Sequence, residues 1–213
     1  IEESKKNDVV STCANDLLAS CIFKSPGDID IDIAFGTMQR FGIPMYFGGP
    51  HPAYLACSGK FLRYMPGRII GESLDIKGNP CYRLGLQTRE QHIKKERATS
   101  NICTSQALLA NISSMFSIYH GKEGLTEIAE DIHKITGMFH NWCVSNGVEV
   151  INENYFDTVT FKHPDADWIQ EELYRNNILV FRDNDTISVT FDECSEYRDK
   201  SVIVNAISRK QND

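Results

Sequence analysis

The clearest signal for the fold is the stretch Ala98-Thr99-Ser100-Asn101-Ile102-Cys103-Thr104. Hydroxyl and amide side chains such as those at positions 99–101 cap helix N-termini, and Gly121 is a typical helix stop. The apolar residues between them fall at helical spacing: Ala107, Leu108, Met115, Phe116 and Tyr119. The sequence therefore predicts a helix from Ile102 to Tyr119 with a polar segment at its positive end.

Short apolar runs bounded by glycine and proline precede this helix and predict strands. The predicted strands are Asp8 to Cys13, Asp28 to Phe35 and Ala53 to Cys57. The arms of 68–86 flank the turn Lys77-Gly78-Asn79-Pro80 and predict a β-hairpin. Two or three strands and one helix make a poor α/β core, because a parallel sheet needs helices on both faces. We therefore expect that part of a larger domain precedes this chain and that apolar surface is exposed without it.

The rest of the chain has the pattern of a small α+β domain. A helix from Glu123 to Val144 carries an apolar face and ends at Asn146-Gly147. The elements predicted after it are a strand (156–161), a helix (165–175), two strands (178–182 and 186–191) and a helix (195–208). With the junction placed near residues 119–124, the predicted domains are 1–120 and 121–213.

Composition excludes several classes of protein. The chain has 29 acidic and 22 basic residues, spread without long runs of like charge, so nucleic acid is not an expected partner. No apolar stretch reaches the roughly 18 residues that a membrane span requires. Seven irregularly spaced cysteines among apolar neighbours indicate reduced thiols in a core. The chain opens Ile1-Glu2-Glu3 without methionine, so we expect its native amino terminus to be missing or processed.

A polar segment from Gln87 to Gln106 holds the densest group of basic and imidazole side chains: Arg89, His92, Lys94, Lys95 and Arg97. Because this segment leads into a helix N-terminus, it can bind a phosphate through free N–H groups and the helix dipole. Alternatively, the basic residues are a solvated face and Thr99 to Asn101 only cap the helix. The pattern alone favours the second interpretation.

Other patterns carry weaker chemical signals. The loop Gly48-Gly49-Pro50-His51 lets the backbone approach either a ligand or a neighbouring strand. His133, His140 and Cys143 share a face of the second predicted helix, but without nearby carboxylates they indicate packing rather than a metal site. The sequence has no G-x-S-x-G, Walker or G-x-G-x-x-G motif, so hydrolase, nucleotidase and dinucleotide-binding functions lack their main signals.

Five strings together resemble the amino-terminal half of the glycine decarboxylases, the P-proteins of the glycine cleavage system. They are Gln39-Arg40-Phe41-Gly42-Ile43-Pro44, Gly48-Gly49-Pro50-His51, Met65-Pro66-Gly67-Arg68, Leu86-Gln87-Thr88-Arg89-Glu90-Gln91-His92-Ile93 and Ala98-Thr99-Ser100-Asn101-Ile102-Cys103-Thr104. The resemblance implies an α/β, aminotransferase-like fold, which is fold type I of the pyridoxal-phosphate enzymes. Residues 1–120 would be the carboxy-terminal part of the large domain, and residues 121–213 the small α+β domain.

The same resemblance implies that this half does not carry the cofactor. The family's lysine stands in a string His-Lys-Thr-Phe, which corresponds here to Met38-Gln39-Arg40-Phe41 and places Gln39 at the lysine position. A glutamine amide cannot form a Schiff base with a carbonyl. Pyridoxal phosphate would therefore be held covalently by the other half. Arg97 stands where the family often has lysine, which keeps the charge but changes its geometry.

The implied function is that of the complete enzyme, which decarboxylates glycine on pyridoxal phosphate and passes the aminomethyl group to the lipoyl arm of the H-protein. This half would form the interface and a wall of the active site. The candidate cofactor contacts, made in trans to the phosphate, are Thr99, Ser100 and Asn101, and the candidate pocket rim is Arg89, His92, Gly48, Gly49 and His51. Its partners would be glycine, the H-protein and the lysine-bearing half, fused or separate. The expected location is the mitochondrial matrix in a eukaryote and the cytoplasm in a bacterium.

Two alternatives remain. In the first, this half is a catalytically silent scaffold whose pocket touches nothing in the active site. In the second, the chain belongs to another aminotransferase-fold enzyme, such as a relative of the cysteine desulfurases. That enzyme would need its own cofactor-binding lysine, and none of the chain's lysines lies in a suitable string at a strand end.

Overall fold

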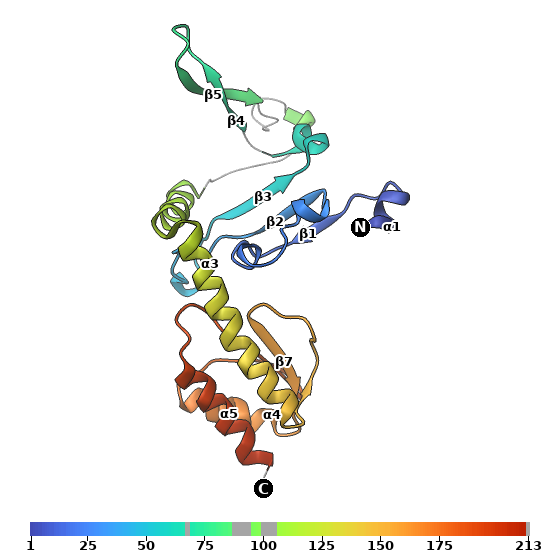
Figure 1. Cartoon of the computed structure of the whole chain (residues 1–213), viewed down its shortest axis with the longest axis vertical. Helices are drawn as coiled ribbons and strands as arrows, with labels where there is room; N and C mark the ends of the chain where they lie inside the picture. Colours follow the sequence, from blue (N-terminus) through green and yellow to red (C-terminus); the bar gives the residue numbers. More distant parts are fainter. Residues whose placement is uncertain (67–68, 87–94, 99–105, 212–213) are drawn as a thin grey trace. The chain divides into compact units, whose positions relative to one another are not determined.

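The computed structural model describes residues 1–66, 69–86, 95–98 and 106–211. The chain forms two compact units, Ile1–His120 and Gly121–Asp213 (Figure 1). Helix α3 (Ala107–Ser145) belongs to both, and its backbone leaves helical geometry at Gly121, where φ is 63° and ψ is −172°. The predicted helix stop at Gly121 is therefore a break within a longer helix, because glycine adopts a positive φ at little cost.

The first unit contains a three-stranded sheet in the order β1-β2-β3, preceded by the short helix α1 (Glu2–Lys6). Strand β1 (Thr12–Ala14) pairs in parallel with β2 (Ile33–Thr37), which pairs antiparallel with β3 (Ala53–Cys57). Gly36 lies under the ring of Tyr54, whose hydroxyl donates to the Asn15 carbonyl at 3.0 Å. A Cβ at Gly36 would lie 2.2 Å from that carbonyl oxygen, so the crossing requires glycine.

Two of the predicted strands begin later than expected, whereas β3 has the predicted bounds. The predicted buried strand from Asp8 is wrong, because Val9 and Val10 are exposed and pairing begins only at Thr12. The predicted strand from Asp28 is wrong in its first half. There the Asp28 carboxylate accepts the Ser25 N–H and hydroxyl, a 3-10 turn covers Gly27–Ile29, and the left-handed Asp30 follows it.

The predicted hairpin is confirmed. Strand β4 (Ile69–Leu74) pairs antiparallel with β5 (Pro80–Leu86) in a separate two-stranded sheet. Its turn is closed by the Asp75 carboxylate, which accepts the N–H groups of Lys77 (2.7 Å) and Asn79 (2.8 Å). Those hydrogen bonds lower the pKa of Asp75, the Asn79 N–H contributing most. The local turn chemistry is therefore sufficient to form the hairpin.

The first part of α3 packs on one side only. Phe116 meets Phe41 edge to face at 5.9 Å and covers Gly42, whose φ of 81° and lack of a Cβ allow the close contact. Elsewhere on the same part of the helix, large apolar side chains are exposed: Leu108, Met115, Ile118 and Tyr119. The predicted start of this helix at Ile102 lies outside the described residues.

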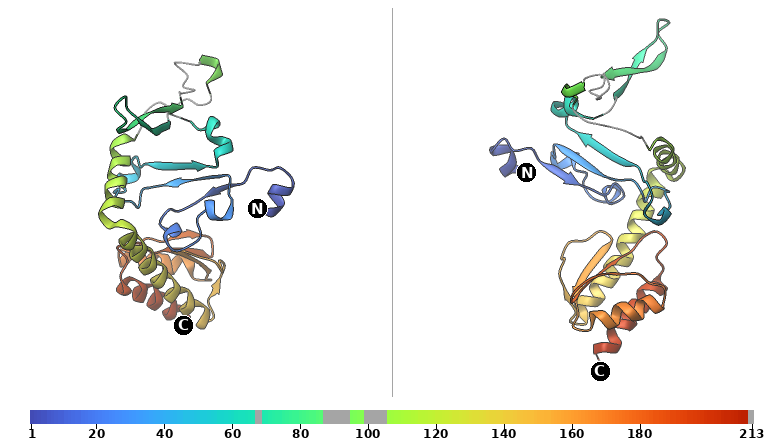
Figure 2. Two further views of the ribbon diagram at one scale, coloured as in Figure 1. Left: turned by 45° about the horizontal axis from the view of Figure 1, so that its top comes forward. Right: turned by 180° about the vertical axis from the view of Figure 1, so that it is seen from behind.

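The second unit has its own core. Its antiparallel sheet has the order β6-β7-β9-β8, with bounds β6 (Glu149–Val150), β7 (Thr158–Lys162), β8 (Phe181–Asp183) and β9 (Thr186–Thr190). Helices α4 (Ala166–Arg175) and α5 (Tyr197–Gln211) pack together, as Figure 2 shows. The buried core lies among α3, α4, α5 and the sheet: Ile135, Phe139, Cys143, Val148, Val159, Phe161, Ala166, Ile169, Leu173, Ile187, Val189, Phe191, Ile203, Ala206 and Ile207.

The two faces of this sheet differ in chemistry. The β7 and β9 side chains that enter the core are apolar, such as Phe161 and its partner Ile187. On the other face, hydroxyls pair across the strands, with Thr158 2.9 Å from Thr190. The predicted order of elements in this unit is confirmed, although β7 begins two residues and β8 three residues later than predicted.

The cysteines depart from the prediction. Cys143 is completely buried, and its burial raises the pKa of the thiol to about 12. Cys194 is exposed, and the other described cysteines are partly exposed. The predicted core location is therefore correct for Cys143 and wrong for Cys194. Within the described part of the chain, no helix is long and apolar enough to span a membrane.

Candidate functional site

The carboxyl ends of β1 and β2 are the natural place to look for a site in the first unit. The two strands are parallel, so their carboxyl ends lie at the same edge of the sheet. Ligands of open α/β sheets bind at this edge. Asp16 follows β1 by two residues, and Gln39 and Arg40 follow β2. The topology thus brings together polar residues that are distant in the sequence.

An ion pair joins the two strand ends. Arg40 Nη1 lies 2.7 Å from Asp16 Oδ2, and the two side chains are 21% and 34% exposed. The other Asp16 oxygen accepts the Leu18 N–H at 2.8 Å. The guanidinium of the residue that follows Gln39 is therefore bound to the end of β1. Sequence reasoning missed this pair, although an acidic residue just after a strand was a usable signal.

Gln39 and His51 are brought together by a threonine that the sequence did not single out. Thr37 Oγ1 accepts the Gln39 N–H at 3.1 Å and lies 3.0 Å from His51 Nδ1. A hydroxyl has one proton, so Thr37 can donate it to Nδ1 of a neutral His51 whose Nε2 is protonated. Gln39 itself is partly buried and presents an amide rather than an amine.

The glycine-rich loop approaches itself rather than a neighbouring strand. Tyr46, Phe47 and Gly48 all have positive φ, at 43°, 56° and 84°. A Cβ at Gly49 would lie 2.9 Å from Tyr46 Cβ, whereas one at Gly48 would meet nothing within 4 Å. The close approach at Gly49 is thus explained by the turn, and Gly48 leaves open backbone. The Phe47 side chain is fully exposed.

The other predicted site residues cannot be placed in this geometry. Thr99, Ser100, Asn101, Arg89 and His92 lie outside the described residues. Their roles as phosphate ligands or pocket rim therefore stay predictions.

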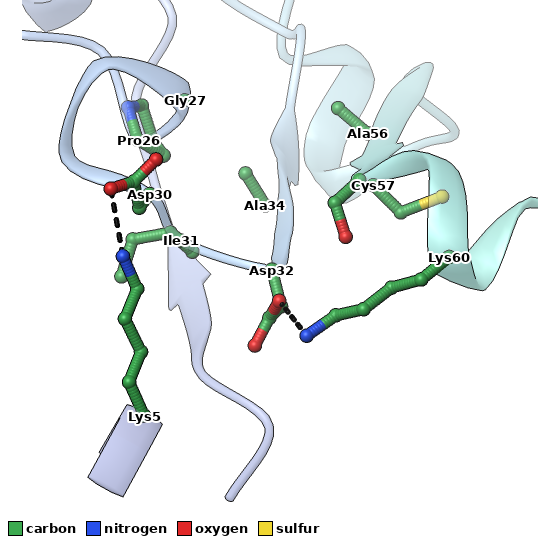
Figure 3. A pocket seen from close by; sticks show the side chains of 11 residues that line it. Lys5, Pro26, Gly27, Asp30, Ile31, Asp32, Ala34, Ala56, Cys57 and Lys60 are labelled. Carbon is green, nitrogen blue, oxygen red and sulfur yellow. Dashed lines mark hydrogen bonds and ion pairs between the residues drawn. The ribbon is translucent and has the colours of Figure 1, made fainter. Parts of the chain in front are cut away.

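A hollow of about 610 Å³ lies at the opposite end of β2. Figure 3 shows the two ion pairs on its walls, Lys5 with Asp30 (2.7 Å) and Lys60 with Asp32 (2.6 Å). The hydrogen bond from Lys60, followed by that from the Ser11 N–H, lowers the pKa of the Asp32 carboxyl. Since these four charges already neutralise one another in pairs, the hollow does not offer an unpaired charge to a ligand.

The histidines of α3 pack rather than gather around an ion. His133 donates from Nδ1 to the Phe156 carbonyl at 3.0 Å, and the rings of His133 and His140 both lie against Tyr155. Cys143 is buried in the core. Within the described residues, no three histidine, cysteine or acidic side chains are placed to hold a metal ion.

Solved structures define the class of this fold. A NifS-like protein from Rickettsia africae matches with a TM-score of 0.67 at 15% identity, covering 100% of this chain and 56% of that one. An apo cysteine desulfurase from Thermococcus onnurineus matches with a TM-score of 0.62 at 13% identity, covering 98% and 54%. The chain therefore has the aminotransferase-like fold type I of pyridoxal-phosphate enzymes, as the sequence predicts.

More similar proteins identify the family. The family model for the glycine cleavage system P-protein matches residues 1–207. The chain is similar to the mitochondrial glycine dehydrogenase (decarboxylating) B of Flaveria pringlei, with 48% identity over 201 residues covering 93% of this chain and 19% of the relative. Psychromonas ingrahamii glycine dehydrogenase (decarboxylating) is 42% identical over 217 residues, covering 99% and 22%.

A solved structure agrees with this assignment. The crystal structure of a glycine decarboxylase (P-protein) in inhibitor-bound form matches with a TM-score of 0.86 at 28% identity, covering 98% of this chain and 50% of that one. The chain belongs to the glycine cleavage system P-protein family. It spans about a fifth of the length of the curated relatives.

Proposed function

We propose that this chain is the part of a glycine decarboxylase that lacks the cofactor-binding lysine, and that it forms the interface and one wall of the active site. The observation that carries this proposal is the strand end after β2. There Gln39 presents an amide, and the adjacent Arg40 guanidinium is paired with Asp16 at 2.7 Å. This end of the sheet does not fit covalent attachment of pyridoxal phosphate, which requires an amine.

The lysine-bearing half, fused or separate, would then hold the cofactor. Bound there, pyridoxal phosphate supplies an electron sink for the electron pair left when glycine loses carbon dioxide. The lipoylated H-protein would receive the aminomethyl group. The enzyme would act in the mitochondrial matrix of a eukaryote or the cytoplasm of a bacterium.

The contribution of this chain would be to bind the cofactor phosphate in trans. Thr99, Ser100 and Asn101 precede α3, whose N-terminal part has unpaired N–H groups and a positive dipole end. Two hydroxyls at such a position can donate short, charge-assisted hydrogen bonds to a phosphate dianion. Arg89 and His92, with Gly48, Gly49 and His51, would shape the rim of the pocket.

Cofactor affinity of the complete enzyme tests the phosphate contact. A hydrogen bond to a charged group contributes about 1.5–3 kcal/mol, so Thr99→Ala or Ser100→Ala should weaken pyridoxal phosphate binding by about ten- to a hundredfold. Ser117→Ala is the matched control, because that hydroxyl donates to Ser113 O within α3. If Thr99 only caps the helix, its replacement lowers stability by about 1 kcal/mol and leaves cofactor affinity unchanged.

The second candidate is a silent scaffold, which the absence of an amine at Gln39 also favours. It predicts normal kinetics and cofactor affinity for the Thr99→Ala and Ser100→Ala enzymes. A separate test addresses the lysine. The isolated chain, mixed with pyridoxal phosphate and borohydride, should give no adduct at a defined lysine, and one such adduct would contradict the assignment of this half.

A further inference from the structure

The β4–β5 hairpin has one strongly apolar face. The cross-strand pairs Ile70 with Leu84, Glu72 with Tyr82 and Leu74 with Pro80 lie on this face, because directly opposed residues point to the same side. Its large apolar side chains are exposed by 58% (Ile70), 67% (Leu74), 78% (Tyr82) and 39% (Leu84). We call these four residues with Glu72 and Pro80 the hairpin face.

The opposite side of the hairpin is small and polar. Gly71 opposes Arg83, and Ser73 opposes Cys81. The hairpin is therefore amphipathic, with its apolar side turned to solvent in this chain. An isolated two-stranded hairpin is marginally stable in water and needs its apolar face covered. The composition of the face thus calls for a permanent partner.

The position of the hairpin in the chain indicates which partner. Strand β5 ends at Leu86, so the next residue is Gln87, the first of the polar segment that leads to Thr99, Ser100 and Asn101. Whatever covers the hairpin face thus anchors one end of the segment to which the proposed function assigns the cofactor phosphate.

We propose that the hairpin face binds the lysine-bearing half of glycine decarboxylase and thereby positions the Gln87–Asn101 segment at that half's cofactor. The inference rests on the proposed function and extends it by naming the surface that binds. An apolar face suits an obligate interface, since permanent interfaces are more hydrophobic than transient ones. The H-protein, which must leave after each turnover, is a poorer occupant. A second copy of this hairpin would not bring a cofactor to the segment.

Photo-crosslinking in the complete enzyme identifies the occupant directly. Tyr82→p-benzoylphenylalanine replaces one exposed aromatic residue by another, and Tyr174 in α4, which is 68% exposed, receives the same change as the control. We expect peptides of the lysine-bearing half to be crosslinked from position 82 and not from position 174. Crosslinks only to the H-protein, to a second copy or to this half, or none above the control, would overturn the proposal.

Substitution tests the coupling to the cofactor. Tyr82→Ser removes the apolar face, and its neighbour Arg83→Ser changes an exposed residue on the opposite side of the same strand. We expect Tyr82→Ser to weaken cofactor retention about tenfold, as loss of a buried aromatic anchor does, and Arg83→Ser to have little effect. Equal effects of the two would contradict the proposal.

The hairpin and phosphate proposals fail separately. If position 82 crosslinks to the lysine-bearing half but Thr99→Ala binds the cofactor normally, the interface stands and the phosphate contact fails. If Thr99→Ala loses affinity but position 82 does not crosslink to that half, the proposed function stands and the hairpin proposal is wrong.

Discussion

The two units differ in where their apolar side chains lie. In the second unit, three helices and one face of a sheet enclose a continuous core around Phe139, Phe161 and Phe191. In the described part of the first unit, the buried apolar side chains are Leu18, Phe41 and Ile43. Meanwhile Phe35 and Leu55 of its sheet are 44% and 39% exposed. The longer unit therefore has the smaller core.

This difference shows which unit can be stable alone. The second unit is a two-layer arrangement that buries one face of its sheet. The first has the strands of an α/β sheet without the helices that such a sheet requires on both faces. We expect the first unit to depend on the rest of the enzyme. The following predictions test the contrast, and both tryptophans, Trp142 and Trp168, lie in the second unit, so fluorescence reports on that unit alone.

The largest expected effect comes from Phe139→Ala. Phe139 is completely buried and contacts the rings of Phe161 and Phe191 at 6.0 and 5.7 Å. Its truncation should cost about 3–5 kcal/mol in the free energy of unfolding, because a cavity replaces the ring. Urea unfolding of the chain followed by tryptophan fluorescence measures this cost.

Met115→Ala is the matched control on the same helix. Met115 is 69% exposed, so its truncation should change the same transition by less than about 0.5 kcal/mol. Similar losses from both substitutions would mean that the exposed part of α3 contributes to the stability of the second unit, and the contrast between the units would be wrong.

A smaller effect is expected from Gly36→Ala in the first unit. The new Cβ would lie 2.2 Å from the Asn15 carbonyl oxygen and 2.9 Å from the Tyr54 ring, so the sheet must shift at a cost of about 1–3 kcal/mol. Amide hydrogen exchange in the complete enzyme should quicken in β1, β2 and β3. Gly59→Ala, where a Cβ meets nothing within 4 Å, should leave exchange unchanged. Unchanged exchange in both variants would show that Tyr54 does not hold the strands together.

Local chemistry accounts for the elements that sequence predicted well. The hairpin follows from the Asp75–Asn79 turn, and α4 follows from its apolar spacing. The starts of β1 and β2 were missed because a strand begins where its partner begins, and pairing of Thr12 with Ile33 is a long-range property. Local signals cannot show where such a pairing stops.

The candidate site was predictable only where its residues share one string. Gln39 and His51 were found through one resemblance, and the structure joins them through Thr37. The Asp16–Arg40 pair was missed, because the two residues meet only through the parallel pairing of β1 and β2. Residue types and spacing do not encode that juxtaposition. The roles of Thr99, Ser100 and Asn101 still rest on the resemblance.

The smallest expected effect is a pH dependence confined to the second unit. His163, between β7 and α4, is 7% exposed, and its Nδ1 accepts the Asp165 N–H at 3.1 Å. Burial lowers the pKa of His163, and the nearby Asp165 carboxylate only partly opposes this. The unfolded chain therefore binds a proton near pH 6.5, where the folded unit does not. Stability should be constant above that pH, fall as the pH drops below it, and level off below the folded pKa. His163→Asn keeps an acceptor for the Asp165 N–H but cannot titrate in this range. Urea midpoints from tryptophan fluorescence, compared between about pH 7.5 and 5.5, should fall more in the wild type than in His163→Asn. Parallel curves for the two proteins would assign the pH dependence to other groups.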